Sequence, residues 1–596
     1  MNGAEAPFRD RLLAGLLGAL AFCVFLASPV RQVTDSHFTL LLSENLIRHR
    51  SFALDRHFVR PLDPARFPRL RPNGLPSQIR EAPNGHLYLF FPAGSSLLSA
   101  PFVALMNRWS WSTLGADRRY DAAAERRMQG LLAAALMGAL TAVCFLTARL
   151  FLPLLPSLVA ALVAAFATPV WSTASRGLWS LTWQLLLIGL SLLQLAAHEA
   201  RGRRLRPALL ATLLCWAYFV RPTSALFIVA VSLYLLRFER ALFARYAATG
   251  ALWLGAFVAY SLAHFGSALP PYYEAGRLSL EGFGAHLLGN LVAPSRGLLV
   301  FTPVLLVLAA WLLRHRQRLP APRLVEPSLV AIAAHLGVVS AFPDWAGGHS
   351  YGPRMTADLV PWLFLLGCMA LAPALDPPRP AWIALAGALC AWGVFVHGRG
   401  ALAQATWEWN LDTEIDANVS RRAWDWRHPQ FLAGLVEPER AQRGSLQHPP
   451  YTPGMRIAAG DPAAADYLVE GWGPALDGAR WSRGLEAVFA FALEAPRPLV
   501  LRLRLAPYLA DPRLARQRLV VVLNGSPLGE RTLTERGAVE LSIAVPAQAL
   551  VLRNLLVFQF PDARSPASLG QGRKREPRAV SLEWIELTPA TSVDRE

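Results

Sequence analysis

The first apolar stretch of the chain decides the fold class, and from residue 12 to residue 37 it reads LLAGLLGALAFCVFLASPVRQVTDSH. Its apolar part, residues 12–30, is long enough to cross a bilayer, since a spanning helix needs about 20 mostly apolar residues. Arg9 and Arg11 precede it, as in a signal peptide. However, no convincing A-x-A cleavage site follows and many more apolar stretches come later. We therefore interpret this stretch as the first membrane-spanning helix and not as a signal peptide that is cleaved.

Composition supports a polytopic membrane protein. Of the 596 residues, 54% are hydrophobic and 17% are charged, whereas ordinary globular domains carry about 25% charge. These values exclude a disordered chain, a coiled coil and a plain cytosolic enzyme. The formal charge of +17 comes almost entirely from arginines spread between apolar segments, so no nucleic-acid partner is expected. The five cysteines have no C-x-x-C spacing, which supports neither a zinc site nor a disulfide framework.

Eleven segments are apolar enough to be predicted as membrane spans. They are residues 12–30, 128–148, 157–170, 178–197, 208–220, 224–236, 246–263, 298–313, 327–342, 357–372 and 381–396. An additional segment, 87–106, is apolar but interrupted by Pro92, Gly94 and Pro101. If it does not span, the short cytoplasmic loops hold roughly three times as many arginines as the outer ones, as the positive-inside rule requires. We therefore expect 87–106 to be juxtamembrane or re-entrant, with the N-terminus in the cytoplasm and the C-terminus outside.

The rest of the chain divides by composition. Residues 1–398 form the predicted transmembrane domain, including a long first outer loop at 31–127. Residues 399–466 form a linker with Trp407, Trp409, Trp424 and Trp426, which we read as an interfacial collar rather than a sugar platform. From 467 to 588 the hydrophobic period becomes two, at 486–491, 499–505, 519–524, 539–545 and 555–560, which predicts an antiparallel β-sandwich. Trp472 and Trp481 are expected in its core, and residues 589–596 form a tail.

Polar groups gather in the predicted outer loops. Asp35 follows the first span directly, where a helix cap and a catalytic base are equally supported. Arg296 and Arg354, with His349, lie in Gly-containing loops. Two readings are equally supported: a phosphate-binding site, and tight turns whose arginines extend to the membrane interface. Glu44, Asp55, Tyr351 and Arg221 are supporting candidates, and for Arg221 a helix break with an interfacial anchor is the stronger reading. Asp344 and Asp358 are plausible as loop groups or as supports of the site.

These residues resemble those of the GT-C glycosyltransferases, a superfamily that includes protein O-mannosyltransferases and the aminoarabinose transferases of lipid A. The resemblance covers roughly 12–396 and rests on Asp35, the long first outer loop and YLFFPAG at 88–94. It also rests on PSRGL at 294–298 and WAGGHSYGPR at 345–354, which look like an uncharacterised bacterial branch. Protein mannosyltransferases carry an Asp-Glu pair where this chain has Asp35-Ser36. The β-sandwich is similar to jelly-roll domains appended to such enzymes.

The resemblance implies a transferase on the outer face of the bacterial inner membrane. Asp35 would be the base of a single inverting displacement, and the donor a polyprenyl-phosphate-linked sugar. Arg296, Arg354 and His349 would stabilise the leaving phosphate. The acceptor is left open among glycan, lipid and protein. No metal site or cofactor is identified, and a requirement for a divalent metal is left open. A transporter or flippase of lipid-linked saccharide, and a non-catalytic envelope scaffold, are the alternatives.

Overall fold

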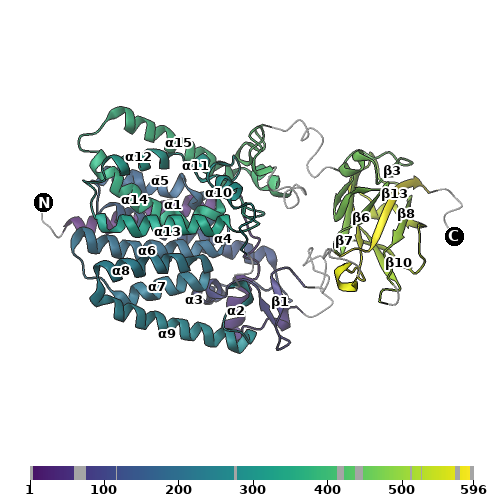
Figure 1. The fold of residues 1–596 in the computed structure, drawn as a ribbon, viewed down its shortest axis with the longest axis horizontal. Helices are drawn as coiled ribbons and strands as arrows, with labels where there is room; N and C mark the ends of the chain where they lie inside the picture. Colours follow the sequence, from purple (N-terminus) through teal and green to yellow (C-terminus); the bar gives the residue numbers. More distant parts are fainter. Residues whose placement is uncertain are drawn as a thin grey trace. The chain divides into compact units, whose positions relative to one another are not determined.

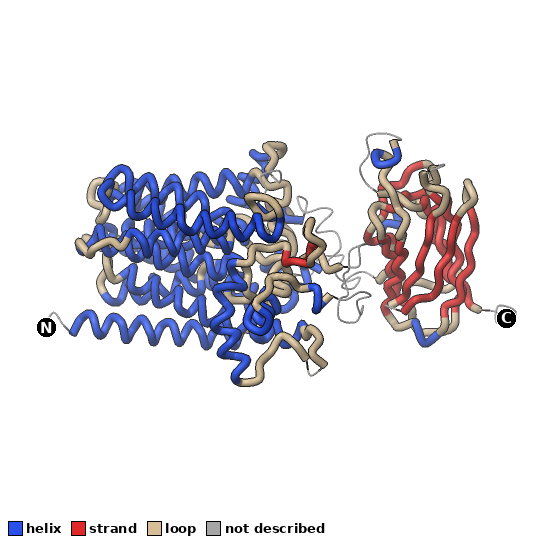
Figure 2. The backbone as a smooth tube through the Cα atoms, turned by 90° about the horizontal axis from the view of Figure 1, so that it is seen from below, coloured by secondary structure: helices blue, strands red, loops and turns tan. Residues whose placement is uncertain are grey.

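The computed structural model describes residues 5–58, 75–115, 117–273, 278–411, 422–436, 448–510, 513–524, 526–570 and 577–590. The chain forms two compact units. The first comprises Met1–Leu62, Leu75–Asn410 and Asn418–Val436, and the second comprises Asp63–Gly74, Leu411–Ala417 and Glu437–Glu596. Helices dominate the first unit and strands dominate the second (Figure 2).

The first unit is a helical bundle. Its helices are α1 (Glu5–Ala27), α2 (Thr39–His49), α3 (Gly94–Arg108), α4 (Ala122–Ala148), α5 (Leu154–Phe166), α6 (Ser180–Arg201), α7 (Pro207–Val220), α8 (Ala225–Phe238), α9 (Arg240–Phe265), α10 (Phe283–Val292), α11 (Leu298–Phe301), α12 (Val304–Arg314), α13 (Val325–Ser340), α14 (Val360–Ala374), α15 (Pro380–Leu402) and α16 (Gln404–Glu408). Each of the eleven predicted spans overlaps at least one of these helices, and the span predicted at 298–313 overlaps both α11 and α12. The helices α10 and α16 were not predicted.

Seven helices among the described residues are long and apolar enough to cross a membrane. They are the segments Phe8–Ala27, Ala122–Ala148, Ser180–Arg201, Arg240–Phe265, Pro322–Ser340, Arg354–Ala374 and Pro380–Leu402. The helices α5, α7, α10 and α12, and the segment Pro222–Phe238, are apolar but shorter. The chain is therefore built as a multi-pass helical membrane domain joined to a β domain.

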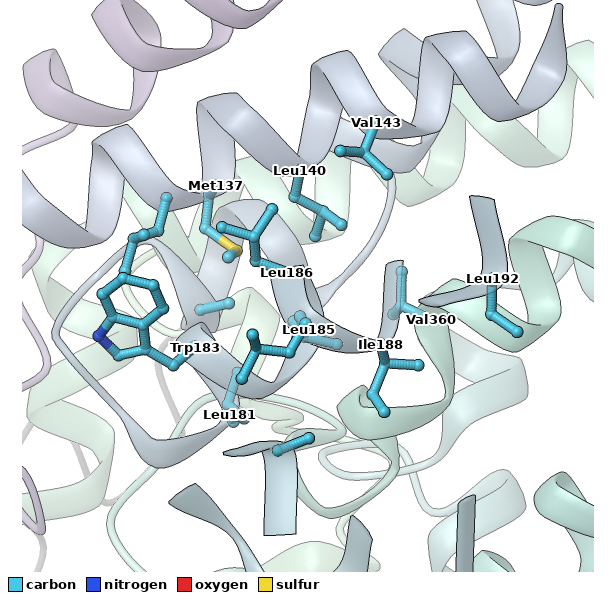
Figure 3. Packing of buried hydrophobic residues seen from close by; sticks show 14 of the residues in the cluster. Met137, Leu140, Val143, Leu181, Trp183, Leu185, Leu186, Ile188, Leu192 and Val360 are labelled. Atoms are coloured by element: carbon cyan, nitrogen blue, oxygen red, sulfur yellow. The ribbon is translucent and has the colours of Figure 1, made fainter. Parts of the chain in front are cut away.

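Close packing between helices holds the bundle together. The side chains that fill the space between α4, α6 and α14 come from Met137, Leu140, Val143, Leu181, Leu185, Leu186, Ile188 and Val360 (Figure 3). Where α1 crosses α4, a Cβ on Gly138 would lie 2.6 Å from the carbonyl oxygen of Gly18. Small residues at such a crossing let two backbones approach, which is how helices associate when lipid surrounds them.

The first predicted outer loop contains two helices and a small hairpin. The strands β1 (Ile79–Glu81) and β2 (Leu87–Leu89) pair antiparallel. Next to them, α2 and α3 lie side by side at the end of the bundle opposite the start of α1 (Figure 1). Ser43 on α2 donates a hydrogen bond of 2.8 Å to the carbonyl of Ser96 on α3. At 15 residues, α3 is not among the spanning candidates, and it covers most of the segment that we expected to be juxtamembrane.

Two antiparallel sheets make up the second unit. Its strands are β3 (Arg456–Ala458), β4 (Leu468–Glu470), β5 (Trp472–Leu476), β6 (Ala479–Ser482), β7 (Glu486–Ala492), β8 (Leu499–Pro507), β9 (Gln517–Leu523), β10 (Ser526–Leu533), β11 (Val539–Val545), β12 (Arg553–Gln559) and β13 (Val580–Pro589). One sheet has the order β10-β9-β12-β7-β4 and the other β11-β8-β13-β6-β5, with β3 paired to β13.

Buried side chains from both sheets form one hydrophobic core, which includes Phe489 and Leu556 from one sheet and Leu503 and Ile585 from the other. Burial alternates along β9, as a strand with one face on a core requires. Trp472 packs against this core, in agreement with the prediction. Trp481 is half-buried, and its ring contacts that of Tyr508, with centroids 5.9 Å apart.

Candidate active site around Asp35

Asp35 lies in the short connection between α1 and α2. Gln32, three residues earlier, anchors this connection: its backbone N–H donates to the carbonyl of Arg176 at 2.9 Å, and its Nε2 donates to that of Ser172 at 2.8 Å. A Cβ on Gly177 would lie only 2.2 Å from the carbonyl oxygen of Gln32. Only glycine allows this approach, so the segment that carries Asp35 is held against residues 172–177.

Asp35 does not cap α2. The carboxylate of Glu125, in the first turn of α4, accepts the backbone N–H groups of Phe38 at 3.0 Å and Leu40 at 2.8 Å. Glu125 is fully buried and also accepts from the hydroxyl of Tyr120 and from Gln129. Because Glu125 fills the capping role, the Asp35 side chain is available for other chemistry.

The Asp35 carboxylate forms an ion pair with Arg354, which lies 319 residues away in the sequence. The Arg354 side chain is 12% exposed and that of Asp35 is 39% exposed. A second nitrogen of Arg354 donates to the carbonyl of Gly347 at 3.0 Å, and its guanidinium carbon lies 4.0 Å from the ring centroid of Trp179. The Nε of Arg354 is buried and has no hydrogen-bond partner in the structure. The two residues that the sequence singled out are thus in direct contact.

Arg221 brings another positive charge toward Asp35. Its Nε donates to the buried carboxylate of Asp358 at 2.7 Å, and its Nη1 donates to Ser180 at 3.0 Å. Burial alone would lower the pKa of Arg221, but the charge of Asp358 and its hydrogen bond, together with the charge of Asp35, raise the pKa above its usual value. Asp358 is therefore a partner that fixes Arg221, and Arg221 lies within electrostatic reach of Asp35.

Arg296 is enclosed by protein acceptors. Its Nε donates to the carbonyl of Ala346 at 2.8 Å. Its Nη1 donates to the carbonyl of Ser295 and to the side chain of Gln430, and its Nη2 lies 3.4 Å from the carbonyl of Gly348 and from Asn410. Burial, opposed by Tyr351 and reinforced by the charge of Arg354, lowers the pKa of Arg296 to about 9. A guanidinium has five N–H groups, and all five are used here. This arrangement favours a structural role and differs from the predicted phosphate contact.

Three supporting candidates are also held by the fold. Buried Glu44 accepts from Arg48, Ser112 and Thr113. Burial raises the pKa of Glu44, but these hydrogen bonds outweigh it and lower the pKa below its usual value. Asp55 accepts from the backbone of Leu87 at 3.0 Å and from His86 at 3.1 Å. Tyr351 is fully buried and donates to the carbonyl of Val396 at 2.6 Å.

The remaining predicted residue, His349, is half-buried in the same loop as Arg354. That loop turns at Gly347, Gly348 and Gly352, whose φ angles are 75°, 59° and 59°. Within the ranges that the structure describes, no three His, Cys, Asp or Glu side chains lie together as metal ligands.

Sequence reasoning missed Glu125 and Trp179. An acidic residue in the first turn of an apolar helix is a signal that could have found Glu125, because charges near membrane depth require a partner. Nothing in the local sequence distinguishes Trp179 from the other eighteen tryptophans.

No protein-family model matches the chain, and no curated protein matches it in sequence. Among solved structures it is similar to arabinosyltransferase EmbB from Mycobacterium smegmatis, with 12% identity and a TM-score of 0.35, over 97% of this chain and 64% of that one. It is also similar to a family GH115 4-O-methyl-alpha-glucuronidase, with 12% identity and a TM-score of 0.17, over 64% of this chain and 42% of that one. The chain thus spans less than two thirds of either protein, and both scores are too low to establish a shared fold.

Proposed function

We propose that the chain is a membrane glycosyltransferase that moves a sugar from a polyprenyl-phosphate-linked donor to an acceptor on the outer face of the bacterial inner membrane. The observation that carries the proposal is the ion pair between Asp35 and Arg354. It joins a partly exposed carboxylate to an arginine that rests on a tryptophan ring, at the end of an apolar helical bundle.

The proposed topology has eleven spans, with the N-terminus in the cytoplasm and the two-sheet β domain outside as a jelly-roll-like sandwich. It is supported by the distribution of arginines between loops and by helices at all eleven predicted positions. A lipid-linked sugar cannot leave the bilayer, so its transferase must present its reactive groups at the membrane surface.

The proposed reaction is a single displacement. Asp35 takes the proton of the acceptor hydroxyl while the acceptor oxygen attacks the anomeric carbon of the sugar. The bond from that carbon to the phosphate oxygen breaks, its electron pair stays on the phosphate, and the anomeric configuration inverts. Arg354, with Arg221 beside it, stabilises the negative charge of the leaving phosphate.

The ion pair gives the donor phosphate a role in preparing the base. Arg354 donates to one oxygen of the Asp35 carboxylate. A phosphate competes for the same guanidinium, because arginine binds phosphate oxygens in a fork geometry. Binding of the donor would therefore release Asp35 to accept a proton, so that the base acts only when the sugar is present.

The full chain in proteoliposomes, supplied with a panel of polyprenyl-phosphate-linked hexoses and pentoses, tests this function. We expect Asp35→Asn to lower transfer at least about a hundredfold, the low end of what a general base contributes. A matched control is Glu281→Gln, which removes an exposed carboxylate from the loop before α10. Normal transfer by Asp35→Asn would remove Asp35 from the mechanism, and transfer by no donor of the panel would favour a transporter or a scaffold.

A further inference from the structure

The start of α3 has features of an anion site. The helix begins at Gly94, and its N-cap residue, Ala93, offers no side chain that accepts the free N–H groups of the first turn. These N–H groups carry positive partial charge, which attracts anions to helix N-termini. With 15 residues, α3 is long enough for this effect.

Two buried hydroxyls in that first turn have no partner. Ser95 is 4% exposed and Ser96 is fully buried, yet the Oγ atom of each lacks a hydrogen bond in the structure. Both residues lie in the first turn of the helix, where the backbone N–H groups have no intrahelical acceptor. Ser99, one turn later, differs because its hydroxyl accepts from Trp183 at 2.9 Å. Unpartnered buried hydroxyls in a native fold require an explanation, and a ligand supplies one.

The chain brings this helix start next to Arg221. A Cβ on Gly94 would lie 2.4 Å from the carbonyl oxygen of Phe219 and 2.7 Å from the nitrogen of Val220, and Arg221 is the next residue. Phe90 and Phe91, just before α3, contact the ring of Tyr272 with centroids 5.4 Å apart. The first turn of α3 therefore lies against the backbone that leads into Arg221.

We propose that the N-terminus of α3, with the hydroxyls of Ser95 and Ser96, binds the phosphate of a polyprenyl phosphate opposite Arg221. This inference rests on the proposed function and specifies where its donor phosphate lies. The free N–H groups and two hydroxyls donate to the phosphate oxygens, while Arg221 and Arg354 supply full positive charge. Glycine at 94 is required because any side chain there would push the helix away from Phe219.

Binding of radiolabelled undecaprenyl phosphate to the full chain in nanodiscs tests the site without any sugar transfer. We expect the double variant Ser95→Ala/Ser96→Ala to bind about tenfold more weakly, because it loses hydrogen bonds to a charged group. The control Ser99→Ala makes the same chemical change one turn along the same helix and should keep wild-type affinity. A second variant, Ser95→Asp, should bind still more weakly at an unreduced melting temperature, since an acid suits a helix N-terminus but repels phosphate.

Wild-type affinity in the double variant would overturn this inference. The proposed function would still stand in that case if Asp35→Asn lost sugar transfer. Equal binding of undecaprenol and undecaprenyl phosphate would show that the phosphate is not recognised and would also overturn it. Inorganic phosphate could also displace the lipid when the two are present at equal concentrations. The ligand would then be a free anion, and this result would overturn the link to the donor. Absence of undecaprenyl phosphate binding by the wild type would overturn both proposals.

Discussion

Replacement of Arg296 by lysine separates a structural arginine from one that binds donor phosphate. The guanidinium donates five hydrogen bonds to five acceptors of its own chain, whereas a lysine ammonium has three N–H groups. At least two hydrogen bonds from a charged donor are then lost, at a cost of about 1–3 kcal/mol each, although Gln430 and Asn410 each keep another donor. We therefore expect Arg296→Lys to lower the free energy of unfolding by about 2–6 kcal/mol.

Thermal unfolding of the full chain in detergent, followed by Trp fluorescence, measures this loss as a fall in melting temperature of several degrees. Arg354→Lys is the matched comparison, because Arg354 makes one ion pair and one carbonyl hydrogen bond at a more exposed position. The Arg354→Lys variant should keep a melting temperature close to that of the wild type but should have a higher KM for the donor. Our assignment of Arg296 is refuted if Arg296→Lys melts like the wild type and raises the donor KM as Arg354→Lys does.

Further predictions concern buried charge, pH and topology. Asp358→Asn leaves Arg221 buried without its counter-charge and should cost about 3–5 kcal/mol of stability; an unchanged melting temperature would contradict the role of Asp358. Burial, with the charge of Arg126, lowers the pKa of His37 to about 4 against opposing effects of Val33 and Asp35. The unfolded chain therefore binds the extra proton first, so stability should fall as the pH drops from about 6.5 to 4, and a His37→Gln variant should show a smaller fall. Reporter fusions after Arg204 and after Thr588 should lie on opposite sides of the membrane, and the same side for both would overturn the eleven-span topology.

The helices were predictable because each apolar segment carries its own signal. In the β domain, the five strands with regular alternation, β7, β8, β9, β11 and β12, lie where the period of two placed them. The ten-residue strand β13 was missed because a bulge between Leu582 and Trp584 shifts its register and interrupts the alternation. The edge strand β10 was missed because most of its side chains are exposed and polar.

The candidate site was only partly predictable, because proximity in space depends on topology. Asp35 and Arg354 were identified from their positions beside spans, but their pairing brings together the first and tenth predicted spans. The acceptors around Arg296 include Gln430 and Asn410 from the Trp-rich stretch. That stretch showed no link to residue 296 in the sequence, so the enclosed environment of Arg296 could not be foreseen.

The helix α4 is attached at two points to the elements that flank Asp35. At one point α4 meets α1 through Gly18 and Gly138, and at the other Glu125 holds the start of α2. Asp35 lies in the short connection between α1 and α2. A thinner or thicker membrane changes the tilt of spanning helices, and any change of tilt between α1 and α4 must be absorbed by that connection. We therefore expect the length of the surrounding lipid chains to change the distance between Asp35 and Arg354.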